Sequence, residues 1–366
     1  MNDSLTEGQW IALAAAPFVS AALIRGLMVY AEAWGLVDHP GHRKVHRHPT
    51  PLVGGLGMLI AAVALQLALG RIPFESWSLL AALLIVTAIG VADDAHELSH
   101  RAKFVAQALG AAVIVSGTSV WVLSFGDLLG FGNLELGKWA ILVTIISMVG
   151  VMNAINMIDG LDGLAGSLCL VPILMLALLA AGDASGVAFE LLLLAGVICG
   201  FLLLNLRLPG RSRAMVFMGD TGGMILGMLI AWYSIKIGGA SNSTIKPITA
   251  VWILAVPLLD MGSVMLLRLS QRKSPFHADQ QHLHHVLLHA GYSVNQVVGI
   301  MSALSLACGG VGVAAELQGI PQFAMFPAFL VVWASYIMAL KHPAAVQTLA
   351  RRILPPRAGH QGSVPS

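Results

Sequence analysis

Long apolar stretches run through this 366-residue chain from end to end, and only short polar connections separate them. A helix needs about 20 mostly apolar residues to cross the hydrocarbon core of a bilayer, and many of these stretches approach that length. Only 10% of the residues are charged, whereas soluble domains carry about 25%. The sequence therefore predicts an all-α, polytopic integral membrane protein.

We expect about eleven transmembrane helices, an odd number that would put the two termini on opposite sides of the membrane. The N-terminal residues are acidic and lack the basic region of a cleaved signal peptide, so we expect the first span to be retained. The expected spans are 10–31, 52–70, 77–92, 103–123, 138–155, 164–181, 187–204, 221–237, 247–267, 295–314 and 321–340.

The Lys and Arg residues indicate the orientation, because basic connections stay in the cytoplasm. All but four of the 20 fall in alternate connections, near the end of the first span or in the C-terminal tail; the exceptions are Arg71, Lys138, Lys236 and Lys246. We therefore expect the N-terminus outside and the C-terminus and the functional face in the cytoplasm. One multi-span domain would cover residues 1–343. A basic cytoplasmic tail over 344–366 would lie on the membrane surface or be disordered.

The three cysteines, Cys169, Cys199 and Cys308, all lie within apolar runs. Their spacing is typical of neither a disulfide framework nor a metal site. We expect them to be small core residues.

Four polar residues recur at every third position between two apolar runs: Asn153, Asn156, Asp159 and Asp162. On a helix, neighbouring members of this series share a face. Polar groups at membrane depth are costly, so those that persist usually serve chemistry or transport. The alternative is a set of capping and interhelical hydrogen bonds.

A basic connection over 38–51 carries Lys44 and His46 among several Pro and Gly residues. Such a loop could hold a phosphate near the membrane, although a loop that only sets the topology would also be basic.

Asp93 and Asp94 end the third expected span, with Arg101 and Lys103 shortly after them. Adjacent carboxylates repel each other unless a cation or a proton relieves the repulsion. A pair of hydrogen-bonded caps would also explain them.

Asn205 and the segment from Phe217 to Asp220 form a further polar group on the same expected face. Asp220 opens a helix and could be its N-cap. A carboxylate beside glycines could equally bind Mg²⁺ where phosphate approaches the backbone.

His282, His284 and His285 lie within four residues of one another. We do not expect zinc there, because no cysteine is nearby and the three positions do not share one helix face. Contact with a phosphate or a sugar fits better.

Together, these residues offer carboxylate and amide oxygens for a hard cation and Arg, Lys and His for anions. Oxygen ligands without cysteine favour Mg²⁺ or Mn²⁺. We therefore expect phosphorylated substrates, one of which can be a lipid phosphate because the site would lie at the bilayer edge.

The motifs resemble those of the polyprenyl-phosphate N-acetylhexosamine-1-phosphate transferases, glycosyltransferase family 4. The resemblance extends from about Leu36 to Tyr292 and is strongest to the branch that transfers GlcNAc-1-phosphate. The matching segments are Arg43-Lys44-x-His46, Pro51-x-x-Gly54-Gly55, Asp93-Asp94, Asn153-Ala-x-Asn156-Met-x-Asp159-Gly-x-Asp162-Gly, Phe217-Met-Gly-Asp220 and Gln281-His282-x-His284-His285.

The resemblance implies that the phosphate of undecaprenyl phosphate attacks the β-phosphorus of UDP-GlcNAc. UMP would leave and undecaprenyl-diphospho-GlcNAc would form at the inner membrane. This reaction starts O-antigen, enterobacterial common antigen or related cell-wall polysaccharide synthesis. Tunicamycin, which resembles UDP-GlcNAc joined to a lipid tail, should inhibit it.

The resemblance also implies residue roles. Asn156 and Asp220 would bind Mg²⁺, with Mn²⁺ as the alternative ion. Asp93 and Asp94 would orient or deprotonate the lipid phosphate, and Asp159 would support the ligands or the catalysis. The residues expected to contact substrates are Lys44, His46, Arg101, Lys103, Asn153, Asp162, Asn205, Phe217, His282, His284 and His285. The expected partners are the two substrates and the bilayer, with no nucleic acid; a homodimer is left open.

Alternatives remain. Donors with a 6-deoxy-HexNAc sugar or a phospho-MurNAc-pentapeptide share much of this motif set. A transporter would carry its coupling carboxylates near the membrane midplane, whereas here they cluster at helix ends beside basic loops. A CDP-alcohol phosphotransferase would need an arginine shortly after the first Asp-Gly pair, and the segment that begins at Asp159 lacks it.

Overall fold

The computed structural model describes residues 5–39, 48–118, 120–182, 186–239, 245–274 and 281–353. Those ranges contain fourteen α-helices and one pair of two-residue antiparallel strands, β1 (Val37–Asp38) and β2 (Thr50–Pro51). Short 3₁₀ turns cover Pro73–Glu75, Gly137–Trp139 and Ala180–Gly182. The helices are α1 (Glu7–Met28), α2 (Gly54–Ala68), α3 (Trp77–His96), α4 (His100–Thr118), α5 (Ala140–Ile158), α6 (Leu164–Leu179), α7 (Val187–Asn205), α8 (Gly219–Gly238), α9 (Pro247–Ile253), α10 (Ala255–Ser270), α11 (Leu283–His289), α12 (Val294–Leu317), α13 (Gln322–Lys341) and α14 (Pro343–Ile353).

The predicted all-helical membrane fold is confirmed. In the described part of the chain, seven helices are long and apolar enough to cross a membrane, namely α1, α3, α5 with the turn before it, α7, α8, α12 and α13. The pair α9–α10, bent by 80°, makes an eighth if it is counted as one span, and α2 and α6 are shorter apolar helices. With α4, a helix or helix pair lies in each of the eleven predicted ranges. The count of eleven spans and their orientation stay predictions.

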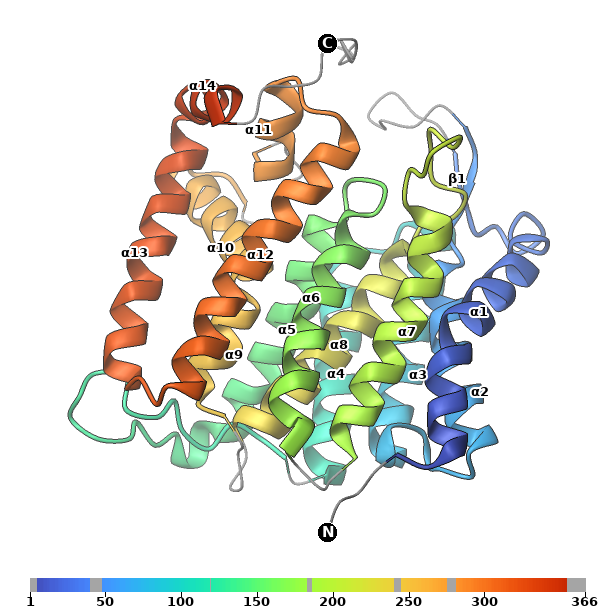
Figure 1. Cartoon of the computed structure of the whole chain (residues 1–366), viewed down its shortest axis with the longest axis horizontal. Coiled ribbons are helices and arrows are strands. Elements are labelled where there is room, and N and C mark those ends of the chain that lie inside the picture. The colour runs from blue at the N-terminus through green and yellow to red at the C-terminus, as the bar shows by residue number, and fades with distance from the viewer. Residues whose placement is uncertain are drawn as a thin grey trace.

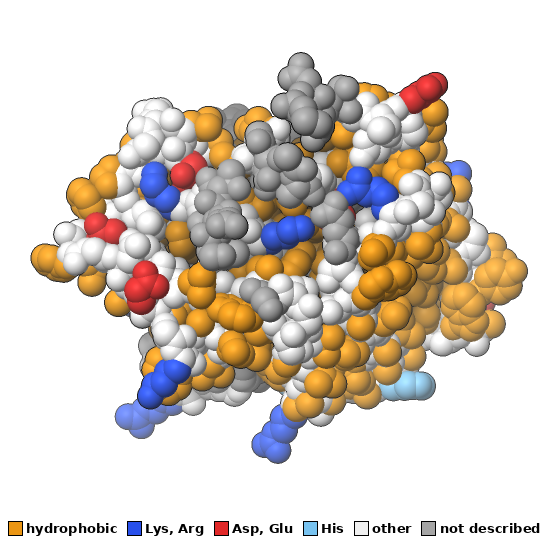
Figure 2. Space-filling view, turned by 90° about the horizontal axis from the view of Figure 1, so that it is seen from below, with side chains coloured by type: hydrophobic (Ala, Val, Ile, Leu, Met, Phe, Trp, Pro, Cys, Tyr) orange, Lys and Arg blue, Asp and Glu red, His pale blue; other side chains and the backbone are white. Residues whose placement is uncertain are grey.

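The helices stand side by side, with α11, α14 and β1 at one end of the bundle (Figure 1). The described chain begins at the opposite end, where α1 starts. That opposite face shows mostly apolar and uncharged side chains with scattered charged ones (Figure 2). The candidate site lies at the α11 end.

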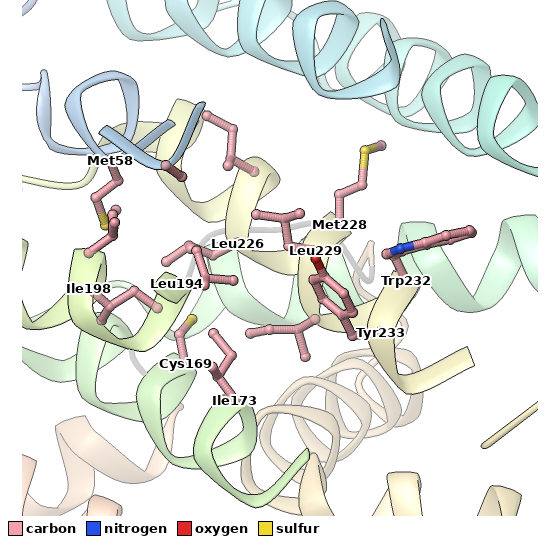
Figure 3. Packing of buried hydrophobic residues seen from close by; sticks show 14 of the residues in the cluster. Met58, Cys169, Ile173, Leu194, Ile198, Leu226, Met228, Leu229, Trp232 and Tyr233 are labelled. Atoms are coloured by element: carbon pink, nitrogen blue, oxygen red, sulfur yellow. The ribbon is translucent and has the colours of Figure 1, made fainter. Parts of the chain in front are cut away.

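Helix α8 is the centre of the bundle. Within an 18-residue apolar stretch of α8, 94% is buried, because α2, α3, α5 and α6 all pack against this helix. A helix that is apolar all round is buried on every side, and α8 follows that rule. Figure 3 shows Leu226, Leu229, Trp232 and Tyr233 of α8 among Met58 of α2, Cys169 and Ile173 of α6, and Leu194 and Ile198 of α7.

Small residues let other helices approach the start of α8 closely. A Cβ on Gly55 of α2 would overlap the backbone of Gly222, and a Cβ on Gly223 would overlap the side-chain oxygen of Asn156. Helices in membranes commonly pack through such small residues. This packing fixes the Asn156 amide of α5 against the first turns of α8.

The predicted C-terminal tail begins with helix α14, which packs against α11 and α13. Figure 1 shows α14 at the end of α13, beside α11. The boundary between domain and tail stays a prediction.

The cysteines largely match their predicted place in the core. Cys169 and Cys308 are buried and Cys199 is half-buried, and all three are free thiols.

Candidate active site

Asp94, at the C-terminal end of α3, caps the N-terminus of α8. Its Oδ1 accepts a hydrogen bond from the Asp220 N–H at 2.7 Å, and its Oδ2 accepts bonds from the Thr221 N–H at 3.2 Å and the Thr221 hydroxyl at 2.6 Å. The first N–H groups of a helix have no partner inside it and carry a partial positive charge. A carboxylate from another helix satisfies them here.

The backbone at the start of α8 requires glycine. Gly219 has φ +71°, and a Cβ there would lie 2.5 Å from a carboxylate oxygen of Asp94. Asp220 is therefore not the N-cap that the sequence left open as an alternative. Its N–H receives the cap from Asp94, and its side chain points to other partners.

Lys103 of α4 links two carboxylates. Its Nζ lies 2.8 Å from Oδ2 of Asp93 and 2.7 Å from Oδ2 of Asp220. Oδ1 of Asp93 accepts a further bond from the Leu98 N–H at 2.7 Å, which holds the turn between α3 and α4. The ends of α3, α4 and α8 thus meet at one ammonium group.

The Asn156 side-chain oxygen is a buried polar atom for which the described residues supply no hydrogen-bond partner. Asn156 and Asp220 line the same pocket. No group of three or more His, Cys, Asp or Glu side chains that could hold a metal occurs among the described residues. Mg²⁺ needs few protein ligands, however, when substrate phosphates and water complete its shell. An amide oxygen without a partner among the described residues, in the same pocket as a carboxylate, therefore fits the expected Mg²⁺.

Asn153, one turn before Asn156, is held inside the protein. Its Nδ2 donates to Gln107 Oε1 at 2.6 Å and to the Val149 carbonyl at 2.8 Å. This bond ties α5 to α4 on the approach to the site.

Asp159 lies just past the end of α5 and is open to a pocket that also contains Asp94, Asp162 and Asp220. The surrounding protein desolvates it, and three neighbouring carboxylates repel its charge. Desolvation by the surrounding protein, followed by repulsion from the Asp220, Asp94 and Asp162 charges, raises the pKa of Asp159 to about 7, although the residue is exposed to the pocket. Asp159 can therefore bind or release a proton near neutral pH.

Asp162 and Asn205 join the loop after α5 to the segment between α7 and α8. Oδ2 of Asp162 accepts bonds from Arg207 Nε at 2.7 Å and the Ala214 N–H at 3.1 Å. Oδ1 of Asn205 accepts from the Gly163 N–H at 2.7 Å, and its Nδ2 donates to the Val216 carbonyl at 2.8 Å. Both side chains therefore hold these two segments together by hydrogen bonds, and both also line the same pocket.

The three histidines cluster at the start of α11, where the rings of His282 and His284 are stacked and that of His285 is tilted against both. The ring centroids of His282 and His284 are 5.4 Å apart, and those of His284 and His285 are 4.2 Å apart. Both ring nitrogens of His284 are buried, with no hydrogen-bond partner among the described residues. Burial, followed by the charges of His285 and His282, lowers the pKa of His284 to about 3 despite the opposing effect of Asp260, so its ring is neutral.

Two pockets meet at these groups. The polar pocket, of about 700 Å³, contains Asp93, Asp94, Asp159, Asp162, Arg207 and Phe217. The apolar pocket, of about 870 Å³, is lined by α4, α5 and α10 and contains Leu142, Ile145, Ile146, Val149, Met261 and Met265. Their shared lining residues are His100, Lys103, Gly160, Asp220 and His285.

Most of the predicted site residues therefore gather in one place. Those that line at least one of the two pockets are Asp93, Asp94, Lys103, Asn153, Asn156, Asp159, Asp162, Asn205, Phe217, Asp220, His282, His284 and His285. Arg101 is exposed and lines neither pocket. Lys44 and His46 lie outside the described residues.

The sequence reasoning missed four polar residues near the site. His100, Gln107 and Arg268 line the apolar pocket, and Asp260 is buried beside His282. Asp260 had a signal, because a carboxylate within an apolar run is costly unless it serves a purpose. Arg268 was assigned to a cytoplasmic connection, yet it is 3% exposed.

The chain is similar in sequence to a known protein family and to several of its members. The family model "Glycosyl transferase family 4" matches residues 76–238. The undecaprenyl-phosphate alpha-N-acetylglucosaminyl 1-phosphate transferase of Haemophilus influenzae is 31% identical over 341 residues, 92% of this chain and 95% of that protein. The proteins of the same name from Salmonella typhi and Escherichia coli K12 are 33% and 30% identical, over 87% and 88% of each chain respectively. At this identity and coverage, the chain belongs to glycosyl transferase family 4, the membrane-bound phosphoglycosyltransferases that act on polyprenyl phosphates.

Proposed function

We propose that the protein transfers GlcNAc-1-phosphate from UDP-GlcNAc to undecaprenyl phosphate on the cytoplasmic side of the bacterial inner membrane. An oxygen of the lipid phosphate attacks the β-phosphorus of the donor. The new P–O bond gives undecaprenyl-diphospho-GlcNAc, and the bond to UMP breaks. The names of the relatives specify undecaprenyl phosphate and an N-acetylglucosaminyl 1-phosphate group, which supports this acceptor and this transferred group.

One observation carries the proposal: a polar and an apolar pocket share their border at Lys103 and Asp220. A reaction between a nucleotide sugar and a lipid phosphate needs these two environments side by side. A soluble substrate pair would have no use for the apolar one.

A stripe along α5 supports the lipid assignment. The residues of α5 that line the apolar pocket are Leu142, Ile145, Ile146, Val149, Gly150, Asn153, Asn156 and Met157, a helical spacing of three and four. From Leu142 to Asn156 the stripe spans about 21 Å at 1.5 Å per residue, and it is apolar at one end and amide-bearing at the other. Leu142 and Ile146 are exposed, so a prenyl chain in the bilayer has access to it.

Phosphoryl transfer depends mainly on positioning and on neutralising charge. Members of the family typically depend on Mg²⁺, and Mg²⁺ held by Asn156 and Asp220 would neutralise phosphate oxygens and the departing UMP. Lys103 presents its ammonium group where the pockets meet. The second pKa of a phosphate is near 6, so the lipid phosphate is largely a dianion at neutral pH, and Asp93 and Asp94 need not act as strong bases.

Donor choice is the finer part of the proposal. We favour UDP-GlcNAc over UDP-6-deoxy-HexNAc and UDP-MurNAc-pentapeptide donors, because the names of the relatives agree on GlcNAc. The product would then start O-antigen, enterobacterial common antigen or a related polysaccharide.

Incubation of purified protein with undecaprenyl phosphate and each UDP-HexNAc in turn, followed by mass analysis of the lipid, tests the donor. We expect a diphospho-GlcNAc lipid and inhibition by tunicamycin; another lipid product would overturn the donor assignment. Cysteine labelling from outside intact cells should spare the 93–103 and 271–289 connections. Labelling there would contradict the cytoplasmic placement.

A further inference from the structure

Asp260 is a buried carboxylate that the proposed reaction does not use. It lies in α10, is 1% exposed, and accepts three hydrogen bonds from two parts of the chain, α13 and the start of α11. The donors are the Tyr336 hydroxyl of α13 at 2.8 Å, the Leu283 N–H at 3.1 Å and Nδ1 of His282 at 2.5 Å. A buried carboxylate in a membrane helix is costly. The three hydrogen bonds that Asp260 accepts therefore indicate a function for this residue.

The bond to His282 determines which ring nitrogen faces the ligand. A carboxylate that accepts from Nδ1–H fixes the orientation of an imidazole and leaves Nε2 as the working atom. His282 lines the apolar pocket, and its ring stacks on His284 with an interplanar angle of 15°. The orientation of the His282 ring therefore also determines the orientation of the His284 ring.

The helix that carries these histidines depends on contacts from outside. Helix α11 has seven residues, which is too short to be stable alone. Asp260 binds the N–H of its first residue, and Arg351 Nε of α14 donates to the Ala290 carbonyl at its C-terminal end at 2.7 Å. Figure 1 shows α11 and α14 together at the same end of the bundle.

We propose that Asp260 is a positioning residue that holds His282 with Nε2 directed at the phosphate or sugar oxygens of the transferred group, with Tyr336 fixing the carboxylate from behind. This inference rests on the proposed function for the identity of the ligand. The juxtaposition of Asp260, His282 and Tyr336 stands without it.

Through Tyr336, Asp260 also links α10 to α13, and the chain offers a matched control for that structural link. One turn from Asp260, the buried Ser263 Oγ accepts a hydrogen bond from Trp333 Nε1 of α13 at 3.1 Å. Ser263→Ala removes an α10–α13 bond without touching the histidines. Asp260→Asn keeps the shape of the side chain and removes its charge, and Tyr336→Phe removes only the supporting hydroxyl.

The experiment uses the full chain in lipid nanodiscs. UMP release is measured while UDP-GlcNAc is varied at saturating undecaprenyl phosphate, and the ring nitrogens of His282 are followed by ¹⁵N NMR, with His282→Gln to assign the signal. Loss of an orienting partner typically lowers activity about 10- to 100-fold. We expect that loss of kcat in Asp260→Asn, together with a changed His282 ring pattern. Tyr336→Phe should lose only a few-fold, and Ser263→Ala should keep wild-type kinetics and the wild-type ring pattern.

Three results would overturn the positioning role: wild-type kcat in Asp260→Asn, an unchanged His282 signal in that variant, or an equal loss in Ser263→Ala. Failure of the proposed function looks different. In that case the wild-type protein releases no UMP from UDP-GlcNAc, while the NMR comparison still decides whether Asp260 orients His282.

Discussion

Removal of the Asp94 carboxylate should destabilise the N-terminal turn of α8, the most buried helix of the bundle. Asp94→Ala deletes the acceptor of three hydrogen bonds, from the N–H groups of Asp220 and Thr221 and from the Thr221 hydroxyl. A hydrogen bond to a charged group contributes about 1.5–3 kcal/mol. Because neighbouring losses are not additive and Asp94 is only half-buried, we expect a total destabilisation of about 3–5 kcal/mol.

Two further variants divide this loss. Thr221→Val removes only the hydroxyl bond and should cost about 1–2 kcal/mol. Asp94→Asn keeps an acceptor for the Asp220 N–H but replaces the second carboxylate oxygen with an N–H donor, so its loss should lie between the other two. None of the three touches Asn156, Lys103 or the histidines.

The assay is the free energy of unfolding in detergent micelles, measured by tryptophan fluorescence during titration with denaturant, beside the transfer rate of the same samples. If Asp94 acts as a cap, the loss of stability should be largest in Asp94→Ala, intermediate in Asp94→Asn and smallest in Thr221→Val. Wild-type unfolding of Asp94→Ala, with its activity abolished, would refute the capping argument and restore Asp94 as a group that acts on the substrate.

Three other outcomes are expected. Chelation with EDTA should abolish transfer, and Asn156→Ala should raise the Mg²⁺ concentration for half-maximal rate at least about tenfold, the typical loss for a missing ligand partner; full activity after chelation would remove the metal site. Ile146→Asp should raise KM for undecaprenyl phosphate but not for UDP-GlcNAc, and a rise for the donor alone would contradict the lipid assignment of the apolar pocket. Because the pKa of Asp159 is raised to about 7, the folded state holds a proton that the unfolded state releases near pH 4, so the contribution of Asp159 to stability falls as pH rises from about 4 to 7. In EDTA, Asp159→Asn should lose that part of the decline, and identical pH profiles would show that the group is not perturbed.

The helices were predictable because apolar length alone specifies them in a membrane. The bend between α9 and α10 was not, and the sequence predicted one span over 247–267. Pro257 lacks the N–H that would bond to the Ile253 carbonyl, and α9 ends at Ile253. Pro17, Pro172 and Pro327 nevertheless lie inside continuous helices. A proline therefore permits a break that only the surrounding packing decides.

The site was predictable to the level of residue types and no further. The sequence identified Asp93 and Asp94 as one acidic pair, but the structure divides them: Asp93 pairs with Lys103, and Asp94 caps α8. Adjacent residues on a helix point about 100° apart, so two neighbours meet different partners, and no local pattern reveals which partner belongs to which.

Asp94 and Asp260 show why the remaining information is tertiary. Asp94 belongs to α3 and accepts a hydrogen bond from the N-terminus of α8, and Asp260 belongs to α10 and accepts one from the N-terminus of α11. Both α8 and α11 carry residues of the site. Capping within a helix can be read from the sequence because the cap precedes the helix directly. A cap from another helix cannot be read from the sequence in this way, because Asp94 lies 126 residues from the N–H that it binds. A buried carboxylate in a membrane helix therefore indicates a partner, and a helix start without a local cap, as at Gly219, shows where to look for it.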